Sequence, residues 1–280
     1  MSNMPEILSP QIEEAIISFI NEEKLFEEKS PKQPIAKGIF NLIEKKCLVV
    51  YYPIVDAEEE NDGMLLTAIP MEEGKQVDVI YINTYQTEEK QVFAAAHELG
   101  HLLKVADYVN RRCNTSIEEE RIVNRFAAVL LMPKDIFNEF ITEKVEKKNG
   151  SSNSVEAKIL LEVIVEAMDH FAVPYNAVAI RLVETGLITE VDGKVFVDGN
   201  DDIPLDYLKK YVERVIYLGN YNNLLKSSRK KYISGLEELL IKAENNQTES
   251  TVKINRLKEK FGILNNNDIF GEMIHISEDV

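Results

Sequence analysis

Two histidines and a glutamate near the middle of the chain have the spacing of a metal-binding helical turn. Residues 97 to 101 read HELGH, which places His97 and His101 four residues apart. On a helix both imidazoles then project from one face, about a turn apart, and can bind one metal ion. Glu98 lies beside them and is free to act as a general base. This arrangement predicts a hydrolytic zinc site.

A catalytic zinc ion uses three protein ligands and keeps a fourth position for water, whose pKa the metal lowers from 15.7 to about 7. We expect the third ligand from the helical stretch that follows the motif, at 116–132. Glu120 is the preferred candidate, with Glu118 and Glu119 as alternatives. Asn124 lies one turn after Glu120 on the same face, where it can orient a ligand histidine through its second ring nitrogen.

The elements around these residues have clear start and stop signals. Thr87 is a candidate N-cap for the zinc-binding helix, whose polar exit we expect near 110–114. Ser116 and Glu119 have the spacing of a capping box for the next helix, which gives Glu119 a structural role and favours Glu120 as the ligand. Apolar residues at helical spacing predict that the zinc-binding helix buries one face: Val92, Phe93, Ala96, Leu99, Leu102 and Leu103.

Two longer runs carry a family resemblance. QVFAAAHELGHLL at 91–103 and EEERIVNRFAAVLLMP at 118–133 resemble the ImmA/IrrE family of metallopeptidases. The signature of that family is a helical HELGH followed by a Glu-x-x-x-Asn-x-Phe-Ala-x-x-Leu-Leu-Met-Pro segment. The resemblance covers roughly residues 35–190, and the last 80 or so residues match nothing recognisable.

The resemblance implies a site and an activity. It carries the family's zinc ligands onto His97, His101 and Glu120, with one Zn²⁺ per chain, and its general base onto Glu98. It implies a cytoplasmic, bacterial or phage-encoded endopeptidase that cleaves a helix-turn-helix repressor and so releases the genes that the repressor silences. The substrate is an analogy, because substrate identity does not transfer from motifs.

The expected fold class is α+β: a zincin-like metallopeptidase with a small, mainly antiparallel sheet packed on helices, followed by a helical C-terminal region. Strands are predicted at 47–53, 63–69 and 77–83 from their apolar, β-branched and aromatic content. The expected domains are an N-terminal helix and linker (1–34), the catalytic domain (35–150), a helix-turn-helix-like region packed on it (151–200) and a helical region of unknown role (201–280).

Further site residues follow from the zincin comparison. In such proteases the strand before the zinc helix borders the cleft, and an extended substrate can add to its edge. By resemblance that role falls on Tyr81, Ile82 and Asn83, although a place in the sheet interior is an equally good interpretation of each. His170 is a candidate to stabilise the tetrahedral oxyanion, with a cap or core role as the alternative. Cys113 could touch the metal or be an ordinary loop thiol.

Residues 155–198 have the order helix, turn, helix and hairpin, in which Asp192 and Gly193 would form the turn of a wing. The second helix offers Arg181 alone among acidic neighbours, so direct DNA binding is disfavoured. Residues 204–245 have a helical pattern, and a last helix is expected near 252–263.

Composition agrees with a soluble globular protein, with 45% hydrophobic and 29% charged residues. The formal charge of −16 argues against a nucleic-acid coat protein and favours a basic partner. Two cysteines imply no disulfide framework, and neither a membrane span nor a secretion signal is apparent. We therefore expect a cytoplasmic protein with a protein substrate and no membrane partner.

Two other functions remain open. The chain could be a non-catalytic regulator that uses a zincin-like fold to bind a partner, although an intact Glu98 argues against a pure scaffold. It could instead be a helix-turn-helix transcription regulator, which the acidic composition of 155–198 argues against.

Overall fold

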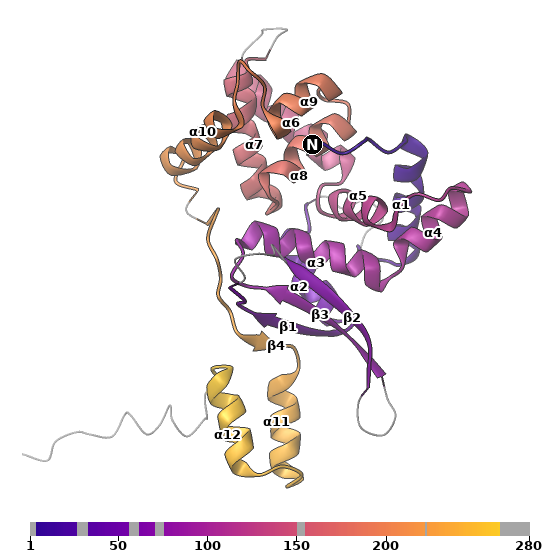
Figure 1. Cartoon of the computed structure of the whole chain (residues 1–280), viewed down its shortest axis with the longest axis vertical. Helices are drawn as coiled ribbons and strands as arrows, with labels where there is room; N and C mark the ends of the chain where they lie inside the picture. The colour runs from indigo at the N-terminus through magenta and orange to yellow at the C-terminus, as the bar shows by residue number, and fades with distance from the viewer. Residues whose placement is uncertain are drawn as a thin grey trace, which may run out of the picture.

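The structure is a computed structural model that describes residues 4–26, 33–55, 62–70, 76–149, 155–221 and 223–263. It has the expected α+β fold, with a small sheet, a helical body on one side of it and a helical hairpin on the other (Figure 1). Residues 27–32 of the expected N-terminal helix and linker (1–34) lie outside the described residues, as do residues 150–154. The boundaries of the four domains therefore stay predictions.

The sheet has four strands in the order β2-β3-β1-β4. Their bounds are β1 (Leu48–Tyr52), β2 (Gly63–Pro70), β3 (Gln76–Asn83) and β4 (Tyr232–Ile233). β1 and β3 pair in parallel, whereas β2 with β3 and β4 with β1 pair antiparallel. The sheet is therefore mixed, with a parallel pair at its centre.

One prediction about this sheet is wrong. Tyr81, Ile82 and Asn83 do not lie on an edge strand, because β3 pairs with β1 on one side and β2 on the other. Tyr81, for example, is opposite Val50 of β1 and Met64 of β2. The strand at this edge of the sheet is instead β2, which has no described strand on its outer side, so an extended substrate could pair with β2.

The motif helix α3 (Glu88–Leu102) packs on the sheet, and α5 (Glu119–Leu131) packs on α3. The expected helical face of α3 is buried, with Val92, Ala96 and Leu99 at 0% exposure. α2 (Gly38–Glu44) and α1 (Pro10–Glu22) complete this part of the core, α1 against α5 and α4. Helix α5 is thus held on both flanks.

The helix expected to continue to 110–114 breaks earlier than predicted. α3 ends at Leu102, and α4 (Val105–Cys113) begins after Lys104, whose φ of 56° is left-handed. The apolar pattern restarts at Val105, and burial of Val105 and Val109 turns the second segment onto α1. This bend leaves the C-terminal turn of α3 half-exposed.

The hairpin expected at Asp192 and Gly193 is also wrong, because both residues lie within helix α9 (Glu190–Asp198). Thr189 is the N-cap, and its hydroxyl oxygen accepts from the backbone N–H of Asp192 at 3.2 Å. A Cβ at Gly193 would lie 2.1 Å from Cγ2 of Val183, so this glycine serves close helix packing rather than a turn.

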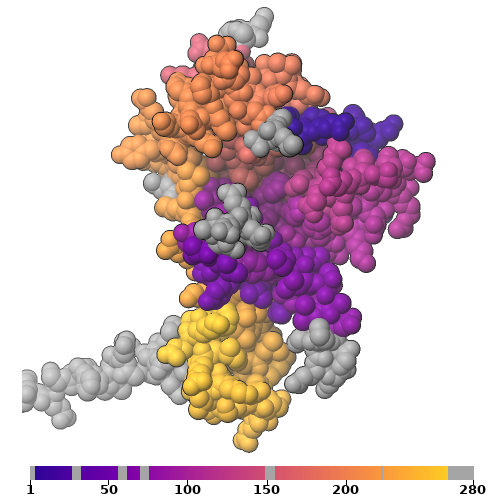
Figure 2. Space-filling view, in the orientation of Figure 1, coloured from indigo at the N-terminus to yellow at the C-terminus, as the bar shows by residue number. Residues whose placement is uncertain are grey.

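The remaining helices form a bundle at one end of the molecule (Figure 1). It contains α6 (Lys134–Asn149), α7 (Ala157–Phe171), α8 (Tyr175–Glu184), α9 and α10 (Leu205–Leu218). The hairpin of α11 (Leu236–Asn245) and α12 (Thr251–Lys260) lies at the opposite end, as the yellow lobe in Figure 2. None of the described helices is long and apolar enough to cross a membrane.

The described residues between α10 and α11 are not helical, contrary to the pattern expected over 204–245. Residues 223–234 return to the sheet, where the backbone N–H of Glu88 donates to Lys226 (2.8 Å) and that of Ser234 to Val49 (2.9 Å). The run from 226 to 231 carries no apolar side chain, so a helix there would bury nothing. Its backbone instead pairs with the turn before α3, and β4 then covers the β1 edge.

Candidate metal centre

Helices α3 and α5 approach closely because Gly100 has no side chain. A Cβ at this position would lie 2.9 Å from Cδ1 of Phe126 and 3.0 Å from Cγ1 of Val123, both on α5. The glycine of HELGH therefore lets the first turn of α5 reach the imidazoles of α3.

His97, His101 and Glu120 converge at this contact. The Nε2 atoms of the two histidines are 3.1 Å apart. Glu120 Oε2 lies 3.3 Å from Nε2 of His97, and its Oε1 lies 3.2 Å from Nε2 of His101. The two imidazoles are mostly buried, at 18% side-chain exposure, while Glu120 is 57% exposed. The three residues form a group that could hold a metal ion.

The spacing of these atoms fits a tetrahedral zinc ion. Ligands at about 2.0–2.1 Å from zinc, with tetrahedral angles, lie roughly 3.3 Å from one another. The 3.1 Å between the two Nε2 atoms is close to that value. The 3.2 and 3.3 Å contacts of Glu120 are made by its two different carboxylate oxygens, and one ligand atom from each of the three residues lies within 4.8 Å of the others. Two histidines and one carboxylate are also a donor set that catalytic zinc uses.

The second ring nitrogen of each histidine has its own acceptor. Nδ1 of His97 donates to Oδ1 of Asn124 at 3.0 Å, and Nδ1 of His101 donates to Oε1 of Glu119 at 2.8 Å. Because both acceptors place the ring proton on Nδ1, the two Nε2 atoms present lone pairs to each other and to the Glu120 carboxylate. Such facing acceptors repel unless a cation lies between them.

The capping box predicted for Ser116 and Glu119 is wrong. Helix α5 begins at Glu119 itself, with Glu118 as N-cap and no side-chain cap hydrogen bond. Glu119 is therefore in the first helical position rather than the third, and its carboxylate turns toward His101.

Glu98 lies against the edge strand at the rim of the same site. The side chain is buried, and burial raises the pKa of this carboxyl to about 7, an effect opposed in part by His101 and by a hydrogen bond from the Leu65 backbone. Gly63 permits this approach, because a Cβ there would lie 3.2 Å from Cγ of Glu98. Burial lowers the pKa of His97, and the nearby His101 lowers it further. A basic carboxylate and neutral imidazoles are what the predicted chemistry needs.

An open cleft of about 680 Å³ leads to these residues. One wall is β2, through Gly63, Met64, Leu65 and Thr67, and the other is the α3–α4 bend with the start of α5. The sequence missed β2 as the strand that borders the cleft. The signal available was Gly63, at the start of a predicted strand, where a backbone must pass close to a neighbour.

Two further candidates lie away from the cleft. None of the described residues that line the cleft is on α7, which carries His170. The His170 ring stacks on Phe140 with centroids 4.4 Å apart, and burial lowers its pKa. His170 is exposed and lies in the last turn of α7, so of the two alternatives that the sequence left open, the role at a helix end fits better than the core role. Cys113 Sγ lies 3.9 Å from the carbonyl oxygen of Gln11 and is not in the histidine–glutamate group.

Comparison with known protein families gives a match. Residues 59–183 match the family profile Peptidase_M78, described as the IrrE N-terminal-like domain. The matched segment contains the whole histidine–glutamate group and ends in α8. A search of curated proteins finds no significant match. Residues 59–183, a little under half of the chain, are therefore similar to the IrrE N-terminal-like domain of this metallopeptidase family.

Proposed function

We propose that the protein is a zinc-dependent endopeptidase in which His97, His101 and Glu120 hold one zinc ion and Glu98 is the general base. The observation that carries this proposal is the convergence of two Nε2 atoms, 3.1 Å apart, with the Glu120 carboxylate, whose two oxygens lie 3.2 and 3.3 Å from them. Two histidines and a carboxylate gathered in this way are a donor set that catalytic zinc uses. Asn124 and Glu119 are positioning residues, because each fixes the tautomer and orientation of one histidine.

When bound, zinc supplies Lewis acidity toward the scissile carbonyl and a water of lowered pKa. Glu98 takes a proton from the attacking water as its oxygen bonds to the carbonyl carbon. The same carboxyl then delivers that proton to the amine nitrogen as the C–N bond breaks. A pKa near 7 suits both transfers, and a neighbouring cation would favour the ionised form that starts the cycle.

The substrate class follows from the cleft wall. An extended polypeptide can add to β2 through backbone hydrogen bonds, which places its carbonyls beside the histidines. The cleft is open enough for a polypeptide segment rather than only a terminal residue. These features support endopeptidase activity on an extended or unfolded stretch of a protein.

A helix-turn-helix repressor is the proposed physiological substrate, and its cleavage would release the genes it silences. Support comes from the family resemblance and from the net charge of −16, which favours a partner with a basic DNA-binding face. Two alternatives remain: a regulator that acts by contact alone, and a transcription regulator that binds DNA directly.

Co-expression with helix-turn-helix proteins encoded beside it tests this proposal. We expect the wild type to produce one site-specific fragment, while Glu98→Gln leaves the same protein intact. The mutant should retain zinc, because Glu98 is not one of the converging ligands. If Glu98→Gln supports the full cellular response without cleavage, the contact-only regulator is the better account. A specific gel shift with genomic DNA would instead favour the transcription regulator.

A further inference from the structure

A second hollow of about 340 Å³ lies next to the candidate metal centre. The two share Asn124, which lines the hollow and also accepts from Nδ1 of His97 at 3.0 Å. Phe93, another lining residue, precedes His97 by one turn on α3, and Ala128 follows Asn124 by one turn on α5. One helical turn rises about 5.4 Å, so these two lining residues lie about that far along their helices from His97 and Asn124. An extended polypeptide covers that distance in about two residues.

The walls of this hollow are largely apolar and come from four parts of the chain. Phe93 is on α3, Ala128 on α5, Ala177 and Ile180 on α8, and Leu8 belongs to the segment before α1. The volume is within the range of pockets that hold small ligands or single side chains.

The charged groups at its border already have partners of opposite sign. Arg121 pairs with Glu6 at 2.9 Å. Arg125 pairs with Glu13 at 2.6 Å and also with Glu184. A charged side chain entering the hollow would lose its hydration without meeting an unpaired counterion, which is unfavourable. Burial of an apolar side chain there would be favourable, because it removes apolar surface from water.

We infer that this hollow receives an apolar side chain of the substrate, from a residue next to the cleaved bond, and so sets cleavage specificity. The inference rests on the proposed function and deepens it. It makes Ala128, Ala177 and Ile180 specificity-determining residues and predicts cleavage beside residues such as leucine or phenylalanine.

Two small hydroxamates test the inference without requiring hydrolysis. Both chelate zinc through the same group, but 4-methylpentanohydroxamate carries an isobutyl-like tail and acetohydroxamate only a methyl group. On the zinc-loaded full chain, calorimetry should show the longer compound binding about tenfold to a hundredfold more tightly, the gain expected for burying such a tail.

Variants of the wall sharpen the test. Ala128→Leu should reduce the affinity ratio toward one, with Ala177→Leu as the second variant if the first does not fold. Ile180→Ala should raise the relative affinity of a hydroxamate with a larger, phenyl-bearing tail. The matched control is Ala157→Leu, at an exposed position that does not line this hollow, and it should leave the ratio unchanged.

The outcomes separate the two proposals. If neither hydroxamate binds the zinc-loaded wild type, the proposed metal centre fails and the inference fails with it. If both bind equally, or if filling the hollow leaves their ratio unchanged in a folded variant, only the specificity pocket is overturned.

Discussion

Helix α5 contributes to two polar clusters that differ in burial and in charge balance. The histidine–glutamate group opens to the cleft, and its acceptor atoms face one another. The second cluster, here the buried ion-pair cluster, consists of Glu13 of α1, Arg125 of α5 and Arg181 and Glu184 of α8. Its side chains are 0–9% exposed, and two cations balance two carboxylates.

The difference explains what each cluster can do. In the buried cluster Arg181 bridges Glu13 at 2.9 Å and Glu184 at 3.2 Å, and its Nε donates to the Met132 carbonyl at 3.1 Å. The charges of this cluster balance one another, and its ion pairs connect α5 to α1 and α8. The histidine–glutamate group contains no cationic side chain, so it is suited to bind a metal cation. The buried ion-pair cluster therefore fixes the helix whose first turn supplies Glu120.

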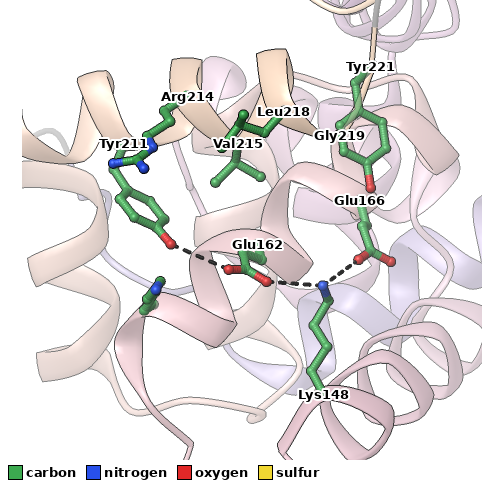
Figure 3. Close-up of a pocket in the computed structure, with 10 residues that line it drawn as sticks. Lys148, Glu162, Glu166, Tyr211, Arg214, Val215, Leu218, Gly219 and Tyr221 are labelled. Carbon is green, nitrogen blue, oxygen red and sulfur yellow. Dashed lines mark hydrogen bonds and ion pairs between the residues drawn. The ribbon is translucent and has the colours of Figure 1, made fainter.

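A third cluster, nearer the surface, can be compared with the buried ion-pair cluster. Figure 3 shows Lys148 of α6 between Glu162 and Glu166 of α7, with the Tyr211 hydroxyl of α10 donating to Glu162. These residues use the same kinds of ion pair, yet Lys148 is 30% exposed. Solvent competes for such pairs, so we expect them to stabilise the fold far less than the buried ones.

Breaking the buried cluster should have the largest effect on folding. Arg181→Ala leaves the two buried carboxylates of Glu13 and Glu184 to share Arg125, so one buried negative charge is uncompensated, which typically costs about 3–5 kcal/mol. Denaturant unfolding measures this loss, and zinc binding should weaken along with the position of α5. A loss below about 1 kcal/mol would contradict the assignment of this cluster as the anchor of α5.

Removing a ligand from the histidine–glutamate group should have the opposite pattern of effects, with zinc lost and folding stability nearly unchanged. Glu120→Ala should abolish zinc retention after dialysis, because it removes one of three ligands. In zinc-free buffer its unfolding free energy should stay within about 0.5 kcal/mol of wild type, as expected of an exposed side chain. Zinc content by elemental analysis and denaturant unfolding are the two readouts.

The orienting role of Glu119 predicts a smaller, graded effect. Glu119→Ala removes the acceptor from Nδ1 of His101 and should weaken zinc binding by about 10- to 100-fold, the usual cost of losing such a partner. Glu118→Ala, one residue earlier, is the matched control and should bind zinc normally. Equal effects of the two substitutions would contradict the observed register of α5.

Lowering the pH should reduce the contribution of the buried ion-pair cluster to the free energy of unfolding. Burial alone would raise the pKa of Glu13, but Arg181 and Arg125 outweigh it and hold the pKa below its ordinary value of 4.5. The stabilising contribution is thus fully present above pH 4.5 and is lost as the pH falls through the lowered pKa. The difference in unfolding free energy between wild type and Glu13→Gln should shrink over that range, and a constant difference would refute the ion pairing.

The surface network should give the smallest effect. Lys148→Ala should cost about 1 kcal/mol or less, and added salt should reduce even that. Thermal unfolding at low and high ionic strength is sufficient to measure it. A loss as large as that of Arg181→Ala would remove the distinction between buried and exposed pairs.

The sequence predicted the parts of the site that depend on local periodicity. The spacing of His97 and His101, and of Glu120 and Asn124, follows from one helical turn, and all four meet in the structure. Features that depend on contacts distant in the chain were missed. The cleft strand is β2 because the order of the sheet is set by long-range pairing.

Local signals also misled where packing overrode them. The Asp192-Gly193 step is a common hairpin turn, yet here its glycine accommodates Val183 and its aspartate lies in a capped first turn. The charges of Glu13, Arg125 and Arg181 showed no pattern in the sequence, because three separate helices bring them together.

Anomalous diffraction at the zinc edge, from crystals of the full chain grown with zinc, tests the central claim most directly. The account predicts one peak per chain, about 2.0–2.2 Å from Nε2 of His97, Nε2 of His101 and the carboxylate of Glu120. Glu119 should remain on Nδ1 of His101. No peak at this position, or a zinc ion bound by Glu119 with Glu120 turned away, would contradict it.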